Sequence, residues 1–468
     1  MKKIKITVIF SILFSLLVIY ASAQTERDIT SLCKIVCHGI SADKILDNSI
    51  ATNSYGHDVI IEITSPEPVG GVYIEYGKSP QKGFINDITP IAQHGFLHEF
   101  ITVNGDNNVT LNFDSAEICT LRVYSVGEAD KSVQRWQSPN NKTDILLCAT
   151  HSDDDQLFFA GLLPYYSRFE DVNLTVAYFI NHYDTYNRTH ELLNGLWHCG
   201  VKNYPIISPF PDGYSENKQG ALNFLSSKGF SYDDVLDFQK SLLNKYRPKV
   251  VVLHDFNGEY GHGAHILNTY SFVEVCENYD DNQHIPQKIY VHLYDKNQII
   301  LDIDSSLDEY SGKSAFNISQ EAFGYHHSQH WTWFYNWIYG KNGSITKAEE
   351  IRSYNPAKYG LYYSSVGEDL LKNDLLENIE TYSATERRLL EEQQQRILKE
   401  QQEKEILLKS EKEIEISINN SSPSIPDNKA FPVFTTYFVI AVFISICIII
   451  FTKIKRQKKQ GVKTIEKH

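Results

Sequence analysis

The chain has 468 residues, of which 42% are hydrophobic, and its formal net charge is −14. This length is enough for two folded domains with further segments around them. The acidic balance argues against a protein that binds nucleic acid through a basic surface, so we expect no nucleic-acid partner.

Residues 1–23 have the pattern of a cleaved signal peptide. A lysine-rich start precedes an apolar run over residues 6–20, and Ala21, Ser22 and Ala23 are the small residues that a signal peptidase requires. An uncleaved anchor is the alternative, although the apolar run is short for a membrane-spanning helix.

Residues 24–140 predict an all-β domain. Short runs rich in β-branched and aromatic residues, separated by Gly, Pro, Asn and Asp, favour a sandwich; they lie at 58–63, 71–76, 109–113 and 119–124. Segments 45–47 and 121–127 resemble the galactose-binding-like jelly roll of discoidin (coagulation factor type C) domains, which implies that fold more than any particular ligand.

Residues 141–375 predict an α/β domain. Apolar runs at 144–149 and 249–253 are typical of buried parallel strands, and further strands are expected at 172–180 and 289–294. Helices are expected between them, at 157–166 and 188–197. This alternation predicts a Rossmann-like parallel sheet, which binds its ligands beyond the carboxyl ends of the strands.

The pattern of the remaining residues predicts attachment to a membrane. Residues 376–418 are dense in Glu, Gln, Lys and Arg, which indicates a charged helical stalk; a coiled-coil dimer through this stalk is an alternative, although the apolar spacing departs from a heptad. A linker at 419–430 precedes an uncharged run at 431–452 that is long enough for a transmembrane helix. The basic tail at 453–468 belongs on the cytoplasmic side.

These features predict a single-pass type I membrane protein of the secretory pathway or cell surface, with its catalytic domain lumenal or extracellular. Glycosylation sequons agree with that compartment; they begin at Asn108, Asn141, Asn173, Asn187, Asn317, Asn342, Asn419 and Asn420. Disulfides can form there as well, but their connectivity cannot be read from the sequence.

Two polar loops follow the predicted buried strands. The first, His151-Ser-Asp-Asp-Asp155, places one imidazole beside three carboxylates, whose repulsion a divalent metal would relieve; an acidic helix N-terminus is the alternative. The second runs from His254 to His265 and contains His262 three residues before its end. Because both loops should open at one edge of the sheet, they predict a shared metal or acid/base site.

Together the two loops resemble the motifs of the PIG-L/LmbE family of zinc-dependent N-deacetylases, over residues 141–370. The family's His-Pro-Asp-Asp-Glu stands here as 151–155, and its His-Pro-Asp-His as 262–265. The resemblance implies Zn2+ as cofactor, with His151, Asp154 and His265 as its ligands. It further implies Asp153 as general base. It implies His262 as the group that stabilises the oxyanion, in its protonated form, or protonates the leaving amine.

The resemblance also implies a substrate contact for Arg188, and Asp212 and Tyr260 are further candidates for substrate binding. Ser152, Asp155 and Gly263-Ala264 depart from the family pattern without removing a predicted ligand. The three histidines His326, His327 and His330 could form a second metal site, although helix packing is the favoured interpretation.

The implied reaction is removal of an N-acetyl group from an N-acetylglucosamine-containing glycan or glycolipid, with release of acetate. N-acetylglucosaminylphosphatidylinositol, the substrate of the best-known eukaryotic relatives, and another glycan remain equally open as the natural substrate. A glycan-binding surface protein with a vestigial deacetylase domain is the alternative, and a hydrolase acting on another bond is a further one.

Overall fold

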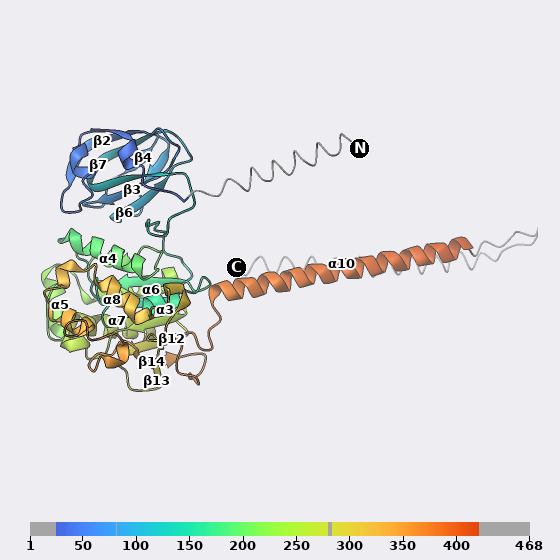
Figure 1. Ribbon diagram of the computed structural model, residues 1–468. Helices are drawn as coiled ribbons and strands as arrows, with labels where there is room; N and C mark the ends of the chain where they lie inside the picture. The colour runs from blue at the N-terminus through green and yellow to red at the C-terminus, as the bar shows by residue number, and fades with distance from the viewer. Residues whose placement is uncertain (1–24, 81, 279–282, 421–468) are drawn as a thin grey trace, which may run out of the picture. The chain divides into compact units, whose positions relative to one another are not determined.

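The computed structural model describes residues 25–80, 82–278 and 283–420. One compact unit ends at Leu390, and a second begins at Glu391. Within the described residues, the first unit contains two sheets of seven strands each (Figure 1).

The first sheet is antiparallel and half-buried. Residues of β2 alternate between the core and solvent, with Val59, Ile61 and Ile63 buried, as expected for a sheet with one covered face. The elements of this region are η1 (Thr30–Leu32), β1 (Lys34–His38), α2 (Ala42–Ile45), β2 (Ser54–Thr64), β3 (Val69–Tyr76), β4 (Gly83–Ile85), β5 (Thr89–Ile91), β6 (His98–Thr102) and β7 (Asn108–Ser125).

This arrangement corrects the predicted jelly-roll sandwich. Hydrogen bonds join all seven strands in one sheet, in the order β1-β2-β7-β3-β6, with β4 and β5 off this path. The reason is the length of β7, which has 18 residues. Its first part pairs with both β2 and β4, and its last part pairs with β3, so a single strand links what would otherwise be separate sheets.

The second sheet has the order β10-β9-β8-β11-β12-β14-β13. Its strands are β8 (Ile145–Ala149), β9 (Leu174–Tyr178), β10 (Ile206–Ile207), β11 (Val250–Leu253), β12 (Lys288–His292), β13 (Gln298–Ile300) and β14 (Lys358–Ser364). The prediction of a Rossmann-like parallel sheet is wrong for this sheet as a whole. The strands from β10 to β12 are parallel, but β14 runs antiparallel to β12, and β13 antiparallel to β14, so the sheet is mixed.

Helices cover both faces of the second sheet. Along β8, Ile145 and Leu147 pack in one hydrophobic cluster with residues of α3 and α8, whereas Leu146 and Cys148 pack in another with residues of α6 and α7. The helices are α3 (Leu162–Ser167), α4 (Tyr186–His198), α5 (Lys218–Ser227), α6 (Tyr232–Tyr246), α7 (Gly263–Glu277), α8 (Ala315–Phe323) and α9 (Trp333–Tyr339), with short 3-10 turns η2 (Glu259–Gly261), η3 (Asp308–Tyr310), η4 (His327–Gln329) and η5 (Ala348–Glu350). The helix expected at 157–166 begins only at Leu162, since residues 152–161 form successive turns.

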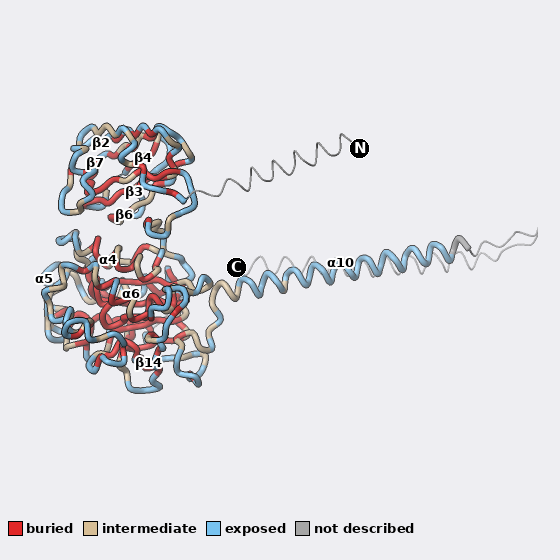
Figure 2. Tube along the Cα trace, viewed as in Figure 1, coloured by how far each residue is buried: buried red, intermediate tan, exposed pale blue. Residues whose placement is uncertain are grey.

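The long helix α10 (Tyr382–Asn420) runs through most of the segment predicted as a stalk. It is exposed along most of its length, in contrast to the buried central strands of the second sheet (Figure 2). Among the described residues, no helix is long and apolar enough to cross a membrane. This finding contradicts the prediction of a single-pass membrane protein. The predicted signal peptide at 1–23 and the predicted span at 431–452 lie outside the described residues.

The six cysteines within the described residues are all free, and four of them are buried. The disulfides that the sequence allowed are therefore not formed in this part of the chain.

Candidate metal centre

The carboxyl ends of the parallel strands gather polar side chains at one edge of the second sheet. His151 follows β8, His254 follows β11, and His292 is the last residue of β12. These three strands are neighbours and run in the same direction, so the side chains at their ends meet. His182 follows β9 and Asp212 follows β10, which extends the site along the same edge.

Three predicted ligand atoms form a nearly equilateral triangle. His151 Nδ1 lies 3.2 Å from Asp154 Oδ2 and 3.1 Å from His265 Nε2, and the third side, from His265 Nε2 to Asp154 Oδ2, measures 3.3 Å. Ligand atoms about 2.0–2.1 Å from a tetrahedral zinc stand about 3.3 Å apart. The three atoms therefore fit one zinc ion with a fourth position left open.

The electrostatics of the triangle favour a cation. Burial opposes the charged form of His151, but Asp154 and Asp212 raise the pKa of this imidazole to about 10. Burial also opposes the charge on Asp154, yet His265 and His151 hold the pKa of this carboxyl well below its usual range. Buried acceptor atoms that converge in this way create a negative potential, and a proton or a metal ion is required to compensate it.

Asp154 is held in place by the start of its own loop. Its Oδ2 accepts the backbone N–H of His151 at 2.6 Å and that of Thr150 at 3.2 Å. The tight turn that directly follows β8 thus presents the carboxylate and the imidazole of His151 side by side.

Glu259 lies at the centre of the histidines. Its carboxylate is fully buried and accepts hydrogen bonds from Nδ1 of His254 and His265, both at 2.7 Å, and from Nδ1 of His292 at 2.6 Å. Burial raises the pKa of Glu259, but the neighbouring His254 and these hydrogen bonds hold it well below the usual range. The predicted site residues did not include His254, Glu259 or His292, although His254 directly follows a predicted strand and His292 lies within another.

Asp153, the predicted general base, is buried beside the ligands. Its Oδ1 accepts a hydrogen bond from Arg188 Nη2 at 3.2 Å, while its Oδ2 has no hydrogen-bond partner in the protein. Burial raises the pKa of Asp153, and Arg188 acts in the opposite direction. Arg188, for which the resemblance implied a substrate contact, therefore contacts Asp153, the predicted base, and orients its carboxylate.

His262 and Tyr260 flank the triangle. His262 is the N-cap of α7, and its Nδ1 accepts the backbone N–H of Ala264 at 3.2 Å. Burial and the neighbouring imidazoles of His151 and His265 lower its pKa to about 2. Because Nδ1 accepts the hydrogen bond from Ala264, a neutral His262 ring carries its proton on Nε2 and is a hydrogen-bond donor there.

Tyr260 has a left-handed backbone conformation, with φ of 49°. Such a conformation is strained for an aromatic residue and is often found at functional sites. Its ring packs against those of His262 and His265, with centroids 5.4 and 5.7 Å apart. Burial and the nearby carboxylates raise the pKa of its phenol, so the hydroxyl keeps its proton.

Asp212 lies 3.5 Å from His151 Nε2 and 3.9 Å from His182 Nδ1, measured from its nearest carboxylate oxygens. It therefore contacts the imidazole of a predicted ligand and is itself partly exposed, as a substrate-binding group at the rim would be.

The three histidines near α9 show no comparable convergence. Among the described residues, the groups of side chains whose ligand atoms could hold a metal contain His151, Asp154, His254, His262 and His265, and none of His326, His327 or His330.

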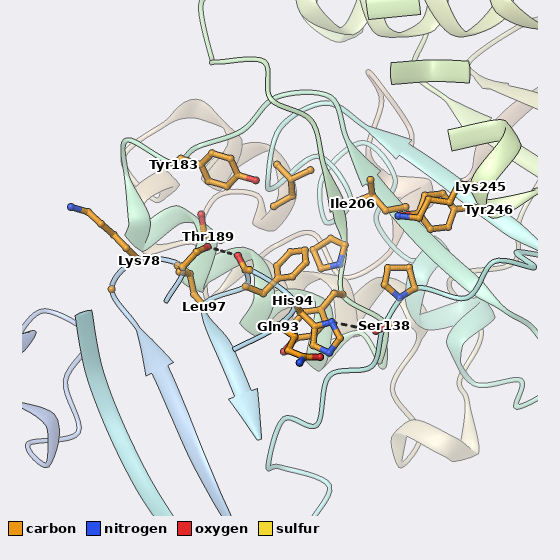
Figure 3. A pocket seen from close by; sticks show the side chains of 18 residues that line it. Lys78, Gln93, His94, Leu97, Ser138, Tyr183, Thr189, Ile206, Lys245 and Tyr246 are labelled. Carbon is orange, nitrogen blue, oxygen red and sulfur yellow. Dashed lines mark hydrogen bonds between the residues drawn. The ribbon is translucent and has the colours of Figure 1, made fainter. Parts of the chain in front are cut away.

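A cavity of about 750 Å³ lies elsewhere in the first unit, lined by residues of both sheet regions (Figure 3). Phe96 and Tyr204 stack on one side with centroids 4.4 Å apart, and His94 Nδ1 lies 3.3 Å from Ser138 Oγ. Tyr183 and Thr189 also line it. None of the predicted site residues does, so the cavity is distinct from the metal centre.

No family model and no curated protein matches this chain. Among solved structures, the 4-carboxy-2-hydroxymuconate hydratase GalB from Pseudomonas putida KT2440 is 15% identical and has a TM-score of 0.31, over 49% of this chain and 99% of that one. A carbohydrate esterase with divergent catalytic and non-catalytic binding functions is 11% identical with a TM-score of 0.19, over 64% of this chain and 99% of that one.

A family two carbohydrate esterase from Cellvibrio japonicus is 10% identical with a TM-score of 0.19, over 57% of this chain and 88% of that one. All three similar proteins are enzymes, but likenesses with such TM-scores carry no argument about this chain. None of the three is described as a PIG-L/LmbE deacetylase or a discoidin domain, so both resemblances stay predictions.

Proposed function

We propose that this chain is a zinc-dependent hydrolase that removes the N-acetyl group from an N-acetylglucosamine-containing glycan or glycolipid. The observation that carries the proposal is the triangle of His151 Nδ1, Asp154 Oδ2 and His265 Nε2, whose sides of 3.1–3.3 Å suit a zinc ion with an open fourth position. The resemblance of residues 151–155 and 262–265 to the PIG-L/LmbE motifs supplies the reaction and the substrate class.

The residues around the triangle suit amide hydrolysis. Zinc, when bound, supplies a Lewis acid and lowers the pKa of a water molecule toward about 7. Asp153 accepts a proton from the attacking water through its unpartnered Oδ2. The water oxygen bonds to the acetamide carbon, and the negative charge that develops on the carbonyl oxygen is stabilised by the Nε2–H of His262 and the hydroxyl of Tyr260.

Collapse of the tetrahedral intermediate breaks the carbon–nitrogen bond. Asp153 returns the proton to the departing nitrogen, which leaves as a free amine, and the acetic acid formed ionises to acetate. Arg188 keeps the base in position throughout, because it contacts Oδ1 and leaves Oδ2 free for the proton.

Acetate release by the full-length chain tests this function directly. We expect purified protein with one zinc per chain to release acetate from N-acetylglucosamine-containing oligosaccharides, and a metal chelator to abolish the release. His265→Ala should lose both zinc and activity, whereas Asp308→Asn, which changes an exposed carboxylate of η3, should retain both.

Two outcomes would contradict the proposal. A chain that binds no zinc lacks the cofactor on which the proposal depends. A chain that binds zinc but releases no acetate from oligosaccharides or from N-acetylglucosaminylphosphatidylinositol would favour the alternative of a glycan-binding protein with a vestigial site.

A further inference from the structure

The carboxylate of Glu259 accepts four hydrogen bonds and is not exposed to solvent. Oε2 accepts the Nδ1 protons of His254 and His265, while Oε1 accepts the Nδ1 proton of His292 at 2.6 Å and the backbone N–H of Asp255 at 3.2 Å. A buried carboxylate is costly unless its oxygens are fully paired, and these four donors meet that requirement. The residue is therefore built into the site rather than into the surface of a turn.

The hydrogen bond between Glu259 and His265 determines which ring nitrogen of His265 is free to bind a metal ion. A neutral imidazole carries one proton, and the bond to Glu259 keeps this proton on Nδ1. The lone pair of Nε2 is then directed into the triangle, 3.1 Å from His151 Nδ1 and 3.3 Å from Asp154 Oδ2. The ring cannot turn over without giving up this bond.

His254 is held in the same way and faces the same carboxylate. With its Nδ1 bonded to Glu259, its Nε2 lies 3.5 Å from Asp154 Oδ2 and has no hydrogen-bond partner. Its ring stacks on that of His265 with centroids 4.0 Å apart. Glu259 thus fixes a pair of stacked imidazoles whose Nε2 atoms both point toward Asp154.

We propose that Glu259 is a positioning residue that fixes the tautomer and orientation of His265 and His254 and thereby sets the affinity of the site for zinc. This inference rests on the proposed function, since it takes zinc as the ion that the triangle holds. Carboxylate partners of metal-bound histidines commonly change metal affinity by about 10–100-fold when they are replaced.

Glu259→Gln tests the inference because it keeps the size of the side chain but replaces one carboxylate oxygen with an NH2 group, which cannot accept a hydrogen bond. We expect the zinc dissociation constant, measured by competition with a chromophoric chelator, to rise by about 10–100-fold. We also expect the visible absorption spectrum of the cobalt-substituted protein to change, because the spectrum reports the geometry of the ligands.

Asp369→Asn is the matched control. Asp369 is also a buried carboxylate; it accepts hydrogen bonds from Lys288 and from the hydroxyl of Tyr290, and no hydrogen bond or ion pair joins it to the predicted ligands. A role of Glu259 in folding alone predicts that both variants lower the thermal midpoint of the metal-free protein and leave the zinc affinity and the cobalt spectrum unchanged. That result would overturn the inference.

Glu259→Asp provides a second variant if Glu259→Gln does not fold. It retains the charge but withdraws the carboxylate by one methylene, so weaker zinc binding than in the wild type is again expected, and wild-type affinity would count against the inference. A wild-type chain that binds no zinc would overturn the proposed function itself, whereas wild-type zinc binding that survives both Glu259 changes would overturn only the role given to Glu259.

Discussion

His98, at the start of β6, is hydrogen-bonded to His190 of α4, with 2.7 Å between Nε2 of the former and Nδ1 of the latter. Both rings are fully buried. His98 Nδ1 also lies 3.0 Å from the hydroxyl of Tyr73 and 2.8 Å from Gln134 Oε1, and Glu75 is 3.9 Å from Nε2. Two imidazoles thus join the first sheet to a helix of the second sheet region.

We predict that this pair makes stability fall in mild acid. Burial lowers the pKa of His98, against the opposing effect of Glu75, and burial with the neighbouring His98 lowers the pKa of His190 to about 2. Above pH about 6.5 both rings are neutral whether folded or unfolded. Below it the unfolded chain takes up protons that the folded chain excludes, so the free energy of unfolding falls by up to about 1.4 kcal/mol per pH unit for each ring.

The measurement is the urea midpoint between pH 7.5 and 5. His190→Gln should reduce the dependence on pH relative to the wild type, whereas His57→Gln, at an exposed position of β2, should leave it unchanged. If the urea midpoint depended equally on pH in all three proteins, the buried pair would not contribute to the pH dependence of stability.

Zinc is expected to stabilise the fold through the three ligands. A ligand present at about 100 times its dissociation constant adds about 2.7 kcal/mol to the free energy of unfolding. Thermal unfolding with added zinc and with a chelator should therefore give separated midpoints for the wild type. His265→Ala should show one midpoint under both conditions, and a wild-type midpoint that does not respond to zinc would contradict the predicted site.

Tyr260→Phe separates the hydroxyl from the ring. The ring packs against Phe158, Trp333 and Phe334, and phenylalanine keeps these contacts and the left-handed backbone. We therefore expect an unchanged thermal midpoint and a kcat lowered by about 10²–10³-fold, as for the loss of one oxyanion donor. Wild-type kcat would remove Tyr260 from the proposed reaction.

The central strands, and three side chains that converge beyond them, could be predicted from the sequence, but not the whole sheet or the whole site. Within the runs at 144–149 and 249–253, residues 145–149 and 250–253 are all apolar because both faces of β8 and β11 are buried, and this pattern is visible in the local sequence. The direction of β14 is not visible in the local sequence, because the direction of a strand depends on the strand with which it pairs. β14 pairs with a strand about 70 residues earlier in the chain.

The same limit applies to Glu259 and His292. They are hydrogen-bonded across 33 positions of sequence, and neither belongs to a short motif. His292 was expected within a strand, where alternation says which face a residue occupies but not that a strand end meets a carboxylate from the next loop. The rule that ligands gather at the carboxyl ends of parallel strands, applied to every predicted strand end, would have selected His254 but neither Glu259 nor His292, because β12 ends at His292 and the predicted strand continued to residue 294.

Asp153→Asn addresses the chemical step. The amide has the shape of the carboxylate and can still accept a hydrogen bond from Arg188 through its oxygen, but it cannot take a proton from water. We expect the zinc content and thermal midpoint to stay at wild-type values and kcat for acetate release to fall by about 10²–10⁴-fold, the usual contribution of a general base. A fall in zinc content together with kcat would instead mean that Asp153 acts through the metal site, and an unchanged kcat would transfer the role of base to another group, with Glu259 excluded because all its acceptor positions are already used.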